Sequence, residues 1–356
     1  MIPISKPYIG EEEKKLVMEV LDSGMLAQGP KVATLEKRFA ELSNVKYAIA
    51  TSSGTTALHI ALLAHGIGPG DEVITTPFTF IASANSIIYT GAKPVFVDVE
   101  EDTFNINPEL IEAAVTPRTK AILPVHLYGY ICDMDALQKI ADKYNLVIIE
   151  DACQAVGATF RGRKAGSFGT GTFSLYATKN IMSGEGGMIT TNDDHIAEQC
   201  KLIRSHGMKV RYYHDMLGYN FRMSDLHAAI GLAQIERFES FTAKRRANAK
   251  YLTENIHSVV NPKLKDDYEH VWHQYTIRVN ASKDRDAAVK QLTEAGIGTG
   301  IFYPVPVHKQ TYIKDMFGDL HFPVSEMLAK EVISLPVHPQ LSQADLELIV
   351  SEVNKL

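Results

Sequence analysis

Lys179 stands between a run with strand character, "TFSLYAT", and a cluster of small residues, "NIMSGEGG". A lysine at the end of a strand is most often a solvated surface residue. An amine that is partly shielded from water beside hydroxyl groups and glycines has a lowered pKa, and it can then form a Schiff base with a carbonyl compound. Taken alone, this position allows both interpretations.

Asp151 ends the apolar run "LVIIED", which is typical of a buried strand. A carboxylate at the mouth of a buried strand needs a partner, and a pyridinium nitrogen or a metal ion would serve. The following turn, or an arginine such as Arg161 or Arg163, would serve equally well. This position also leaves a functional and a structural interpretation open.

A third chemical feature is the stretch "TSSGTTALHIAL", in which a strand ending near Ala50 turns through Gly54 into a helix. The free N–H groups and the positive end of the helix dipole attract an anion, and the hydroxyls of Thr55 and Thr56 add donors. Serine and threonine are also the ordinary capping residues of helices. The stretch therefore indicates either a phosphate site or a capped helix.

These three features together meet the needs of one cofactor. Pyridoxal phosphate requires an anchor for its phosphate, a carboxylate that keeps its ring nitrogen protonated, and a lysine amine that holds its aldehyde. The combination is far more specific than any of its parts. It predicts pyridoxal phosphate as the cofactor, and no metal site is expected.

Strands that end at a common edge must position these side chains. From about residue 45, a short apolar run, a turn of small residues and a helical period repeat several times. Strands that are apolar on both faces and alternate with helices indicate a mostly parallel sheet covered on both sides. The sequence therefore predicts an α/β fold, whose ligands bind at the carboxyl ends of the strands.

A helical period continues from Ser224 to about Ile256, which is long enough to join two domains. We expect the boundary near Thr242, inside this helix. Residues 1–241 then form a large α/β domain that includes an N-terminal helix and loop. Residues 242–356 form a smaller α+β domain.

Composition narrows the classes of function and partner. The chain has 356 residues, a net charge of -6 and scattered basic residues, so no nucleic acid partner is expected. No apolar run approaches the ~20 residues of a membrane helix, and no secretory leader is visible. The three cysteines are too few for a disulfide framework, which predicts a cytoplasmic location.

The chain contains long motifs in a fixed order, namely "TSSGTTALHIAL", "GDEVITTPFTFIASANSIIYTGAKPVFVDV", "PVHLYG", "IIEDACQAVGA", "SLYATKNIMSGEGGMITTND", "LGYNFRMSDLHAAIGLAQIERF" and "FYPVPVHKQ". From residue 1 to about residue 350 the sequence resembles the DegT/DnrJ/EryC1/StrS aminotransferases. These are pyridoxal phosphate enzymes of the aspartate aminotransferase fold (fold type I). The resemblance implies a seven-stranded central sheet sandwiched by helices, with a smaller C-terminal α+β domain.

By this resemblance, Lys179 is the catalytic lysine that holds the cofactor as a Schiff base, and Asp151 is the partner of the pyridine nitrogen. Phe80 would stack on one face of the ring, and Gln154 would lie near the phenolic oxygen. The residues implied to hold the phosphate are Gly54, Thr55, Ser174 and the backbone of Thr56.

Either Asn220 or Arg222, in "GYNFR", is implied to reach the cofactor phosphate of a neighbouring subunit. The resemblance therefore implies a homodimer with active sites shared between the subunits. The implied reaction is ping-pong transamination. A glutamate-like donor gives its amino group to the cofactor, and a keto group, most often that of a nucleotide-linked keto-sugar, then accepts it.

Three features near the implied substrate entrance depart from the family pattern, namely Met25, "YGYIC" and Phe302. A less polar entrance favours small amines, so an amine or diamine:oxo-acid transaminase of the same family is the close alternative. The alternative of another class is a non-catalytic regulatory protein that binds pyridoxal phosphate. Such a protein is expected to lack the lysine that this chain has at position 179.

Overall fold

The computed structural model describes residues 1–279 and 284–356. Its centre is a seven-stranded sheet with the strand order β1-β9-β8-β5-β4-β2-β3. The strands from β8 through β5, β4 and β2 to β3 are parallel, whereas β9 is antiparallel to both of its neighbours. The predicted mostly parallel sheet is confirmed. The strands are β1 (Tyr47–Thr51), β2 (Glu72–Thr75), β3 (Lys93–Phe96), β4 (Thr119–Ile122), β5 (Val147–Asp151), β8 (Thr170–Ser174) and β9 (Gly187–Thr191).

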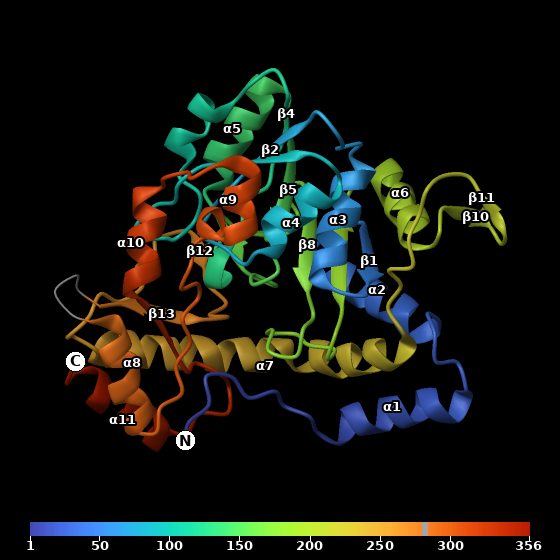
Figure 1. The fold of residues 1–356 in the computed structure, drawn as a ribbon. Coiled ribbons are helices and arrows are strands. Elements are labelled where there is room, and N and C mark those ends of the chain that lie inside the picture. The colour runs from blue at the N-terminus through green and yellow to red at the C-terminus, as the bar shows by residue number, and fades with distance from the viewer. Residues whose placement is uncertain (280–283) are drawn as a thin grey trace.

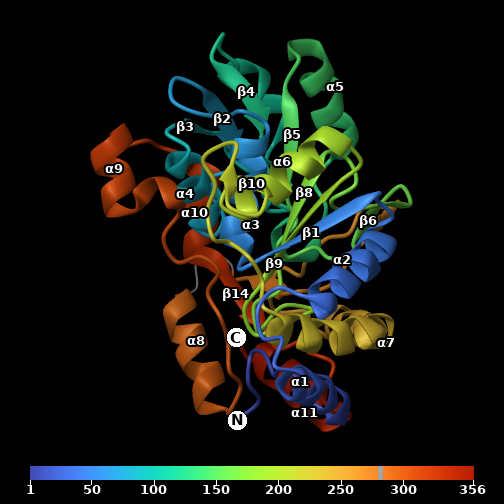
Figure 2. The same ribbon diagram turned by 90° about the vertical axis from the view of Figure 1, so that its right-hand side faces the viewer.

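Helices cover both faces of this sheet, as Figures 1 and 2 show. Ile148 of β5 packs in one buried cluster with residues of α2, α5 and α7 (Asp225–Asn255). Ile149 points to the opposite face, because side chains alternate along a strand, and it packs with residues of α3 and α4. The helices beside the sheet are α2 (Pro30–Ser43), α3 (Gly54–Ala64), α4 (Ala82–Tyr89), α5 (Met134–Tyr144) and α6 (Asp194–Arg204).

The long helix α7 (Asp225–Asn255) runs beneath the sheet in Figure 1 and reaches the C-terminal part of the chain. Its last turns join a separate buried cluster with residues of β13, β14 and α11. The helix passes residue 242 without a break, so the division at this residue stays a prediction. The elements beyond it are β12 (Tyr268–Glu269), β13 (Tyr275–Arg278), α8 (Arg285–Glu294), α9 (Thr311–Phe317), α10 (Pro323–Glu331), β14 (Val332–Leu335) and α11 (Gln343–Val353).

The two ends of the chain lie near each other, beside α8 and α11 (Figure 2). Ile2 forms a β-bridge with Ile297 and belongs to the C-terminal cluster. The helix that follows, α1 (Glu11–Ser23), packs on α7 instead. The first residues therefore pack with the C-terminal part, whereas the sequence favoured packing of the whole N-terminal segment on the large domain.

A small hairpin of β10 (Met208–Val210) and β11 (Tyr213–His214) projects from the body of the molecule (Figure 1). Two further short strands, β6 (Thr159–Phe160) and β7 (Arg163–Lys164), form a sheet with β12. Short 3-10 helices complete the regular structure at 108–110, 112–114, 127–129 and 307–309. Among the described residues, no helix is both long enough and apolar enough to cross a bilayer.

Candidate active site

A cavity of about 390 Å³ opens at the carboxyl edge of the sheet, where β5 and β8 end and α3 and α4 begin. Its volume is in the range of small-molecule sites, which is roughly 300–1,000 Å³. The structure brings most of the predicted site residues together here. Those that line the cavity are Gly54, Thr55, Phe80, Asp151, Gln154, Ser174 and Lys179.

Lys179 lies on the loop that joins β8 to β9. The loop is held at its base, because the Leu175 N–H donates to the Gly186 carbonyl at 2.8 Å and the Ser183 N–H donates to the Leu175 carbonyl at 2.7 Å. Within the described parts of the chain, the Nζ atom of Lys179 has no hydrogen bond or ion pair. Burial lowers the pKa of this amine, while Cys153 and Asp151 act in the opposite direction. The amine is therefore available as a base and a nucleophile.

Asp151 is the last residue of β5, and only 5% of it is exposed. Its Oδ2 atom accepts a hydrogen bond from Ser83 Oγ at 2.7 Å, and its Oδ1 atom accepts one from the Cys153 N–H at 3.2 Å. Arg161 and Arg163 make their contacts elsewhere, with surface aspartates and with a loop carbonyl. The arginine partners that the sequence left open are therefore not used.

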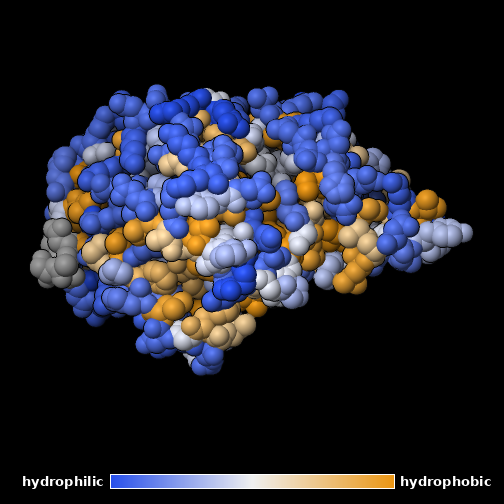
Figure 3. Space-filling view, turned by 90° about the horizontal axis from the view of Figure 1, so that it is seen from above, coloured by the Kyte–Doolittle hydropathy of each residue, from blue (hydrophilic) through white to orange (hydrophobic). Residues whose placement is uncertain are grey.

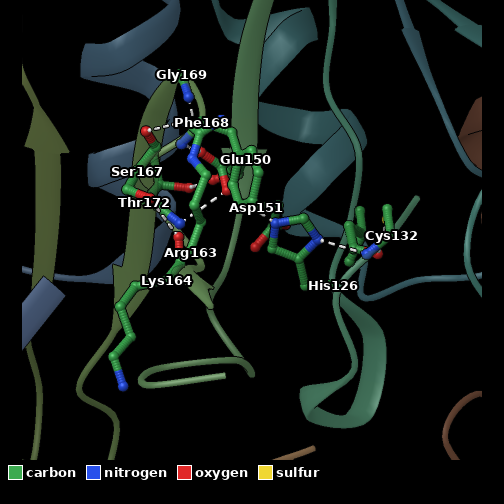
Figure 4. A network of polar contacts seen from close by, with 12 residues as sticks. His126, Cys132, Glu150, Asp151, Arg163, Lys164, Ser167, Phe168, Gly169 and Thr172 are labelled. Atoms are coloured by element: carbon green, nitrogen blue, oxygen red, sulfur yellow. Dashed lines mark hydrogen bonds and ion pairs between the residues drawn. The ribbon is translucent and has the colours of Figure 1, made fainter. Parts of the chain in front are cut away.

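Glu150 precedes Asp151 and lies on the other side of the strand, where it is fully buried (Figure 4). His126 Nδ1 accepts from the Cys132 N–H, so its Nε2 carries the proton and donates to Glu150 Oε2 at 3.0 Å. The His126 N–H also donates to the Asp151 carbonyl at 3.0 Å. These hydrogen bonds hold the end of β5 on the side of the strand opposite the Asp151 side chain. The other donors to Glu150 are the N–H groups of Gly166, Phe168 and Gly169.

The N-terminus of α3 faces the end of β8. A β-carbon at Gly54 would lie only 2.8 Å from the β-carbon of Ser174, so glycine is required for this close approach. Ser53 caps the helix, and its Oγ accepts from the Thr56 N–H at 3.1 Å while Thr56 Oγ1 accepts from the Ser53 N–H at 3.0 Å. Thr56 is thus engaged in the cap and does not line the cavity, whereas Thr55 and Ser174 do.

Aromatic side chains also line the cavity. Phe80 is 53% exposed, and its ring centroid lies 6.0 Å from that of Tyr303. Phe80 lines the cavity and is not part of the buried core. Gln154 Oε1 accepts from the Tyr128 N–H at 2.8 Å, and its Nε2 donates to Tyr303 Oη at 3.2 Å. Gln154 thus connects Tyr128 to Tyr303, which belongs to the 300–306 segment.

Several residues of the cavity escaped the sequence analysis. Ser83, Cys153, His273 and Tyr303 all line it. His273 Nδ1 is buried without a hydrogen bond among the described residues, and burial, followed by the charges of Lys179 and Arg245, keeps the histidine pKa well below its usual value. In the sequence, His273 stands in "HVWH", whose two histidines are not a convincing metal pair because residues three apart in a strand face opposite ways. In the described ranges no cluster of metal-ligating side chains occurs.

Asn220 and Arg222 lie outside the cavity. Both are exposed, and Arg222 Nε donates to Asn220 Oδ1 at 2.9 Å. They follow the projecting β10–β11 hairpin along the chain. A single copy of the chain therefore does not bring these two predicted site residues to its own cavity.

Residues 7–354 match the DegT/DnrJ/EryC1/StrS aminotransferase family. The chain belongs to this family. It is therefore a pyridoxal-phosphate-dependent aminotransferase of fold type I, as its motifs predict. A pleiotropic regulatory protein of Geobacillus stearothermophilus is 45% identical over 365 residues, which is 99% of this chain and 97% of that protein.

Two further members of the family are also similar along their whole length. GDP-perosamine synthase of Caulobacter vibrioides is 42% identical over 366 residues, which is 100% of this chain and 98% of the enzyme. The crystal structure of S. venezuelae DesV in complex with a ketimine intermediate matches with a TM-score of 0.93 and 37% identity, and covers 97% of this chain and 94% of that chain.

Proposed function

We propose that this aminotransferase moves an amino group from a glutamate-like donor to the keto group of a nucleotide-linked sugar in two half-reactions of a ping-pong cycle. The observation that carries the proposal is the shared cavity of Lys179 and Asp151 at the carboxyl edge of the sheet. The similarity to GDP-perosamine synthase supports a nucleotide-linked sugar as the acceptor.

The side chains of the cavity fit the cofactor of the family. When bound, pyridoxal phosphate supplies an aldehyde that links covalently to amines and a protonated ring that withdraws electrons. We assign the aldehyde to Lys179 and the ring nitrogen to Asp151, whose two oxygens each retain a lone pair. The phosphate is assigned to the start of α3 with Gly54, Thr55 and Ser174, while Thr56 supports it through the cap. Phe80 is assigned to one ring face and Gln154 to the phenolic oxygen.

The residues of the chain then have distinct tasks. The amine of Lys179, whose pKa is lowered by burial, accepts a proton from the donor carbon at Nζ and returns it later in the cycle. Asp151 is held in position by the Ser83 hydroxyl and the Cys153 N–H. Phe80 and Tyr303, whose ring centroids lie 6.0 Å apart, contribute aromatic surface to the lining of the cavity.

We further propose a homodimer in which Asn220 or Arg222 of one copy completes the cavity of the other. Large apolar side chains are exposed on and just after α1 and on and just after the hairpin, and Figure 3 shows hydrophobic surface on and beside the projection at its right-hand side. Such a surface is typical of an interface. The exposed residues concerned are Met18, Leu21, Met25, Leu26, Val210, Tyr212, Tyr213 and Leu217.

Complementation between inactive variants tests the shared site. One variant carries Lys179→Ala. The other is a double variant that carries both Asn220→Ala and Arg222→Ala. Each variant is expected to be inactive alone. Refolding them together gives mixed dimers with one intact site, so about a quarter of the parent activity returns at equal mixing. No recovery in dimers that form normally would contradict the shared site.

One observation favours the amine or diamine transaminase as the second candidate. Among the described residues, the cavity lining includes one lysine and no arginine. A glutamate donor brings carboxylates that an arginine holds best, whereas a diamine brings none. The name of the regulatory relative favours a non-catalytic role, but the presence of Lys179 opposes it.

A donor screen separates these functions. The protein loaded with pyridoxal phosphate is expected to be yellow and to lose this absorbance when a true donor is added. Glutamate acting while simple diamines fail supports the sugar aminotransferase, and the reverse supports the second candidate. A colourless protein whose spectrum does not respond to pyridoxal phosphate would overturn both, and Lys179→Ala is the matched negative control.

A further inference from the structure

The hydroxyl groups of Thr79 and Ser83 form a chain of hydrogen bonds that ends at Asp151. Ser83 Oγ lies 2.7 Å from Asp151 Oδ2, and Thr79 Oγ1 lies 3.0 Å from Ser83 Oγ. All three side chains line the cavity, yet they are only 3%, 1% and 5% exposed for Thr79, Ser83 and Asp151. Water therefore has little access to this chain of hydrogen bonds.

The ionised carboxylate fixes the direction of both hydrogen bonds. An ionised carboxylate can only accept, and a serine hydroxyl has a single proton to give. Ser83 therefore donates to Asp151, and Thr79 donates to Ser83. The second carboxylate oxygen accepts from the Cys153 N–H at 3.2 Å. Protein groups thus hold both oxygens of Asp151 before any ligand binds.

We infer that Ser83 is a positioning residue, whose hydroxyl, itself held by Thr79, orients the Asp151 carboxylate and stabilises its ionised form. The inference deepens the proposed function and rests on it, because Asp151 is assigned there to the ring nitrogen of the cofactor. A hydrogen bond donated to a carboxylate favours its charged form. Removal of the Ser83 hydroxyl therefore takes a donor away from the carboxylate that is assigned to the protonated ring nitrogen.

Three other titratable groups interact electrostatically with Asp151, namely Lys179, Cys153 and Tyr303. Burial raises the pKa of the Cys153 thiol and of the Tyr303 phenol, so both are neutral near pH 7. Burial lowers the pKa of the Lys179 amine. Substitutions at Ser83 leave all three groups in place, so they isolate the effect of the hydroxyl on Asp151.

The test compares single variants of the protein loaded with pyridoxal phosphate. Ser83→Ala removes the hydroxyl and Ser83→Thr keeps it. Ser86→Ala is the matched control, because Ser86 is an equally buried serine of α4 whose Oγ donates to the carbonyl of Ser83 and not to Asp151. The readouts are the absorbance of the bound cofactor titrated against pH, the pH dependence of kcat, and the midpoint of thermal unfolding.

We expect Ser83→Ala to move the acid limb of both pH profiles upward by about one unit and to lower kcat about tenfold. Ser83→Thr and Ser86→Ala should titrate as the parent does. Thr79→Val removes the donor to Ser83. This variant should shift the acid limb of both pH profiles in the same direction as Ser83→Ala, but by less. If Ser83→Ala fails to fold, Thr79→Val decides by the same readouts.

The possible failures are distinguishable. A yellow, active parent with an unaltered Ser83→Ala variant overturns the inference alone. An equal shift in Ser86→Ala also overturns it, because the effect would then come from general loosening of α4. A parent that takes up no pyridoxal phosphate overturns the proposed function and, with it, this inference.

Discussion

Replacement of Gly54 by alanine tests how closely α3 must approach β8. A methyl group at this position would lie 2.8 Å from the β-carbon of Ser174, 3.0 Å from Cys153 Sγ and 3.2 Å from the α-carbon of Ser174. Non-bonded carbon atoms pack at about 3.5–4.0 Å. The helix start and the strand end must therefore separate by roughly 1 Å, and neither is a flexible side chain that could move aside.

The expected magnitudes follow from this displacement. Overpacking of a well-filled site costs about 1–3 kcal/mol, and alanine in place of helical glycine returns at most about 1 kcal/mol. The free energy of unfolding should thus fall by about 1–2 kcal/mol. The same displacement moves the Ser174 hydroxyl away from the N–H groups of α3, and we expect affinity for pyridoxal phosphate to fall at least about tenfold.

Urea unfolding without cofactor and titration with pyridoxal phosphate measure the two effects separately. Gly68→Ala is the matched control, because the nearest atom to a methyl group there is the Thr90 carbonyl oxygen at 3.8 Å. Its free energy of unfolding should stay within about 0.5 kcal/mol of the parent value, with unchanged cofactor affinity. The reasoning is refuted if Gly54→Ala behaves like Gly68→Ala in both assays.

Two further variants test buried charges. In Glu150→Gln, the new amide NH₂ faces two of the four N–H donors that surround Glu150. The free energy of unfolding in urea should therefore fall by about 3 kcal/mol. A fall of less than about 1 kcal/mol would contradict the hydrogen-bond network. Burial lowers the pKa of Lys179 below its ordinary value of 10.5, so the unfolded chain binds more protons between the two pKa values and stability rises with pH there. Without cofactor, Lys179→Met should therefore be more stable than the parent at pH 7, and the difference should shrink toward pH 10. A difference that is constant or grows with pH excludes the lowered pKa.

Local patterns were sufficient to predict the sheet and two parts of the site. Asp151 ends an apolar strand and Gly54 begins a helix after another strand, so the rule that ligands bind at the carboxyl ends of the strands places them together. No long-range knowledge is needed for this step. The period of the apolar residues and the small residues of the turns are sufficient to predict where the strands end. The role of Ser174 was implied only by the family resemblance.

The rest of the cavity depends on contacts between distant segments. Tyr303 approaches Gln154 only because the segment after α8 packs back on the sheet, and single residues in that segment have no periodicity that predicts it. Ser83 lies in a helix whose spacing does not distinguish a cavity hydroxyl from a buried one. Asn220 and Arg222 lie outside the cavity of their own copy, and the role proposed for them requires a second copy, which local sequence patterns do not place.

The antiparallel strand β9 explains why a lysine can stay at this edge. A parallel successor to β8 would require a crossover to the other end of the sheet, and the residues after Ser174 would leave the site. Because β9 returns directly, the loop between Leu175 and Gly186 stays over the carboxyl edge and closes on itself with two backbone hydrogen bonds at its base. The departure from a fully parallel sheet therefore keeps Lys179 on a short, braced loop beside Asp151, where a flexible crossover would not.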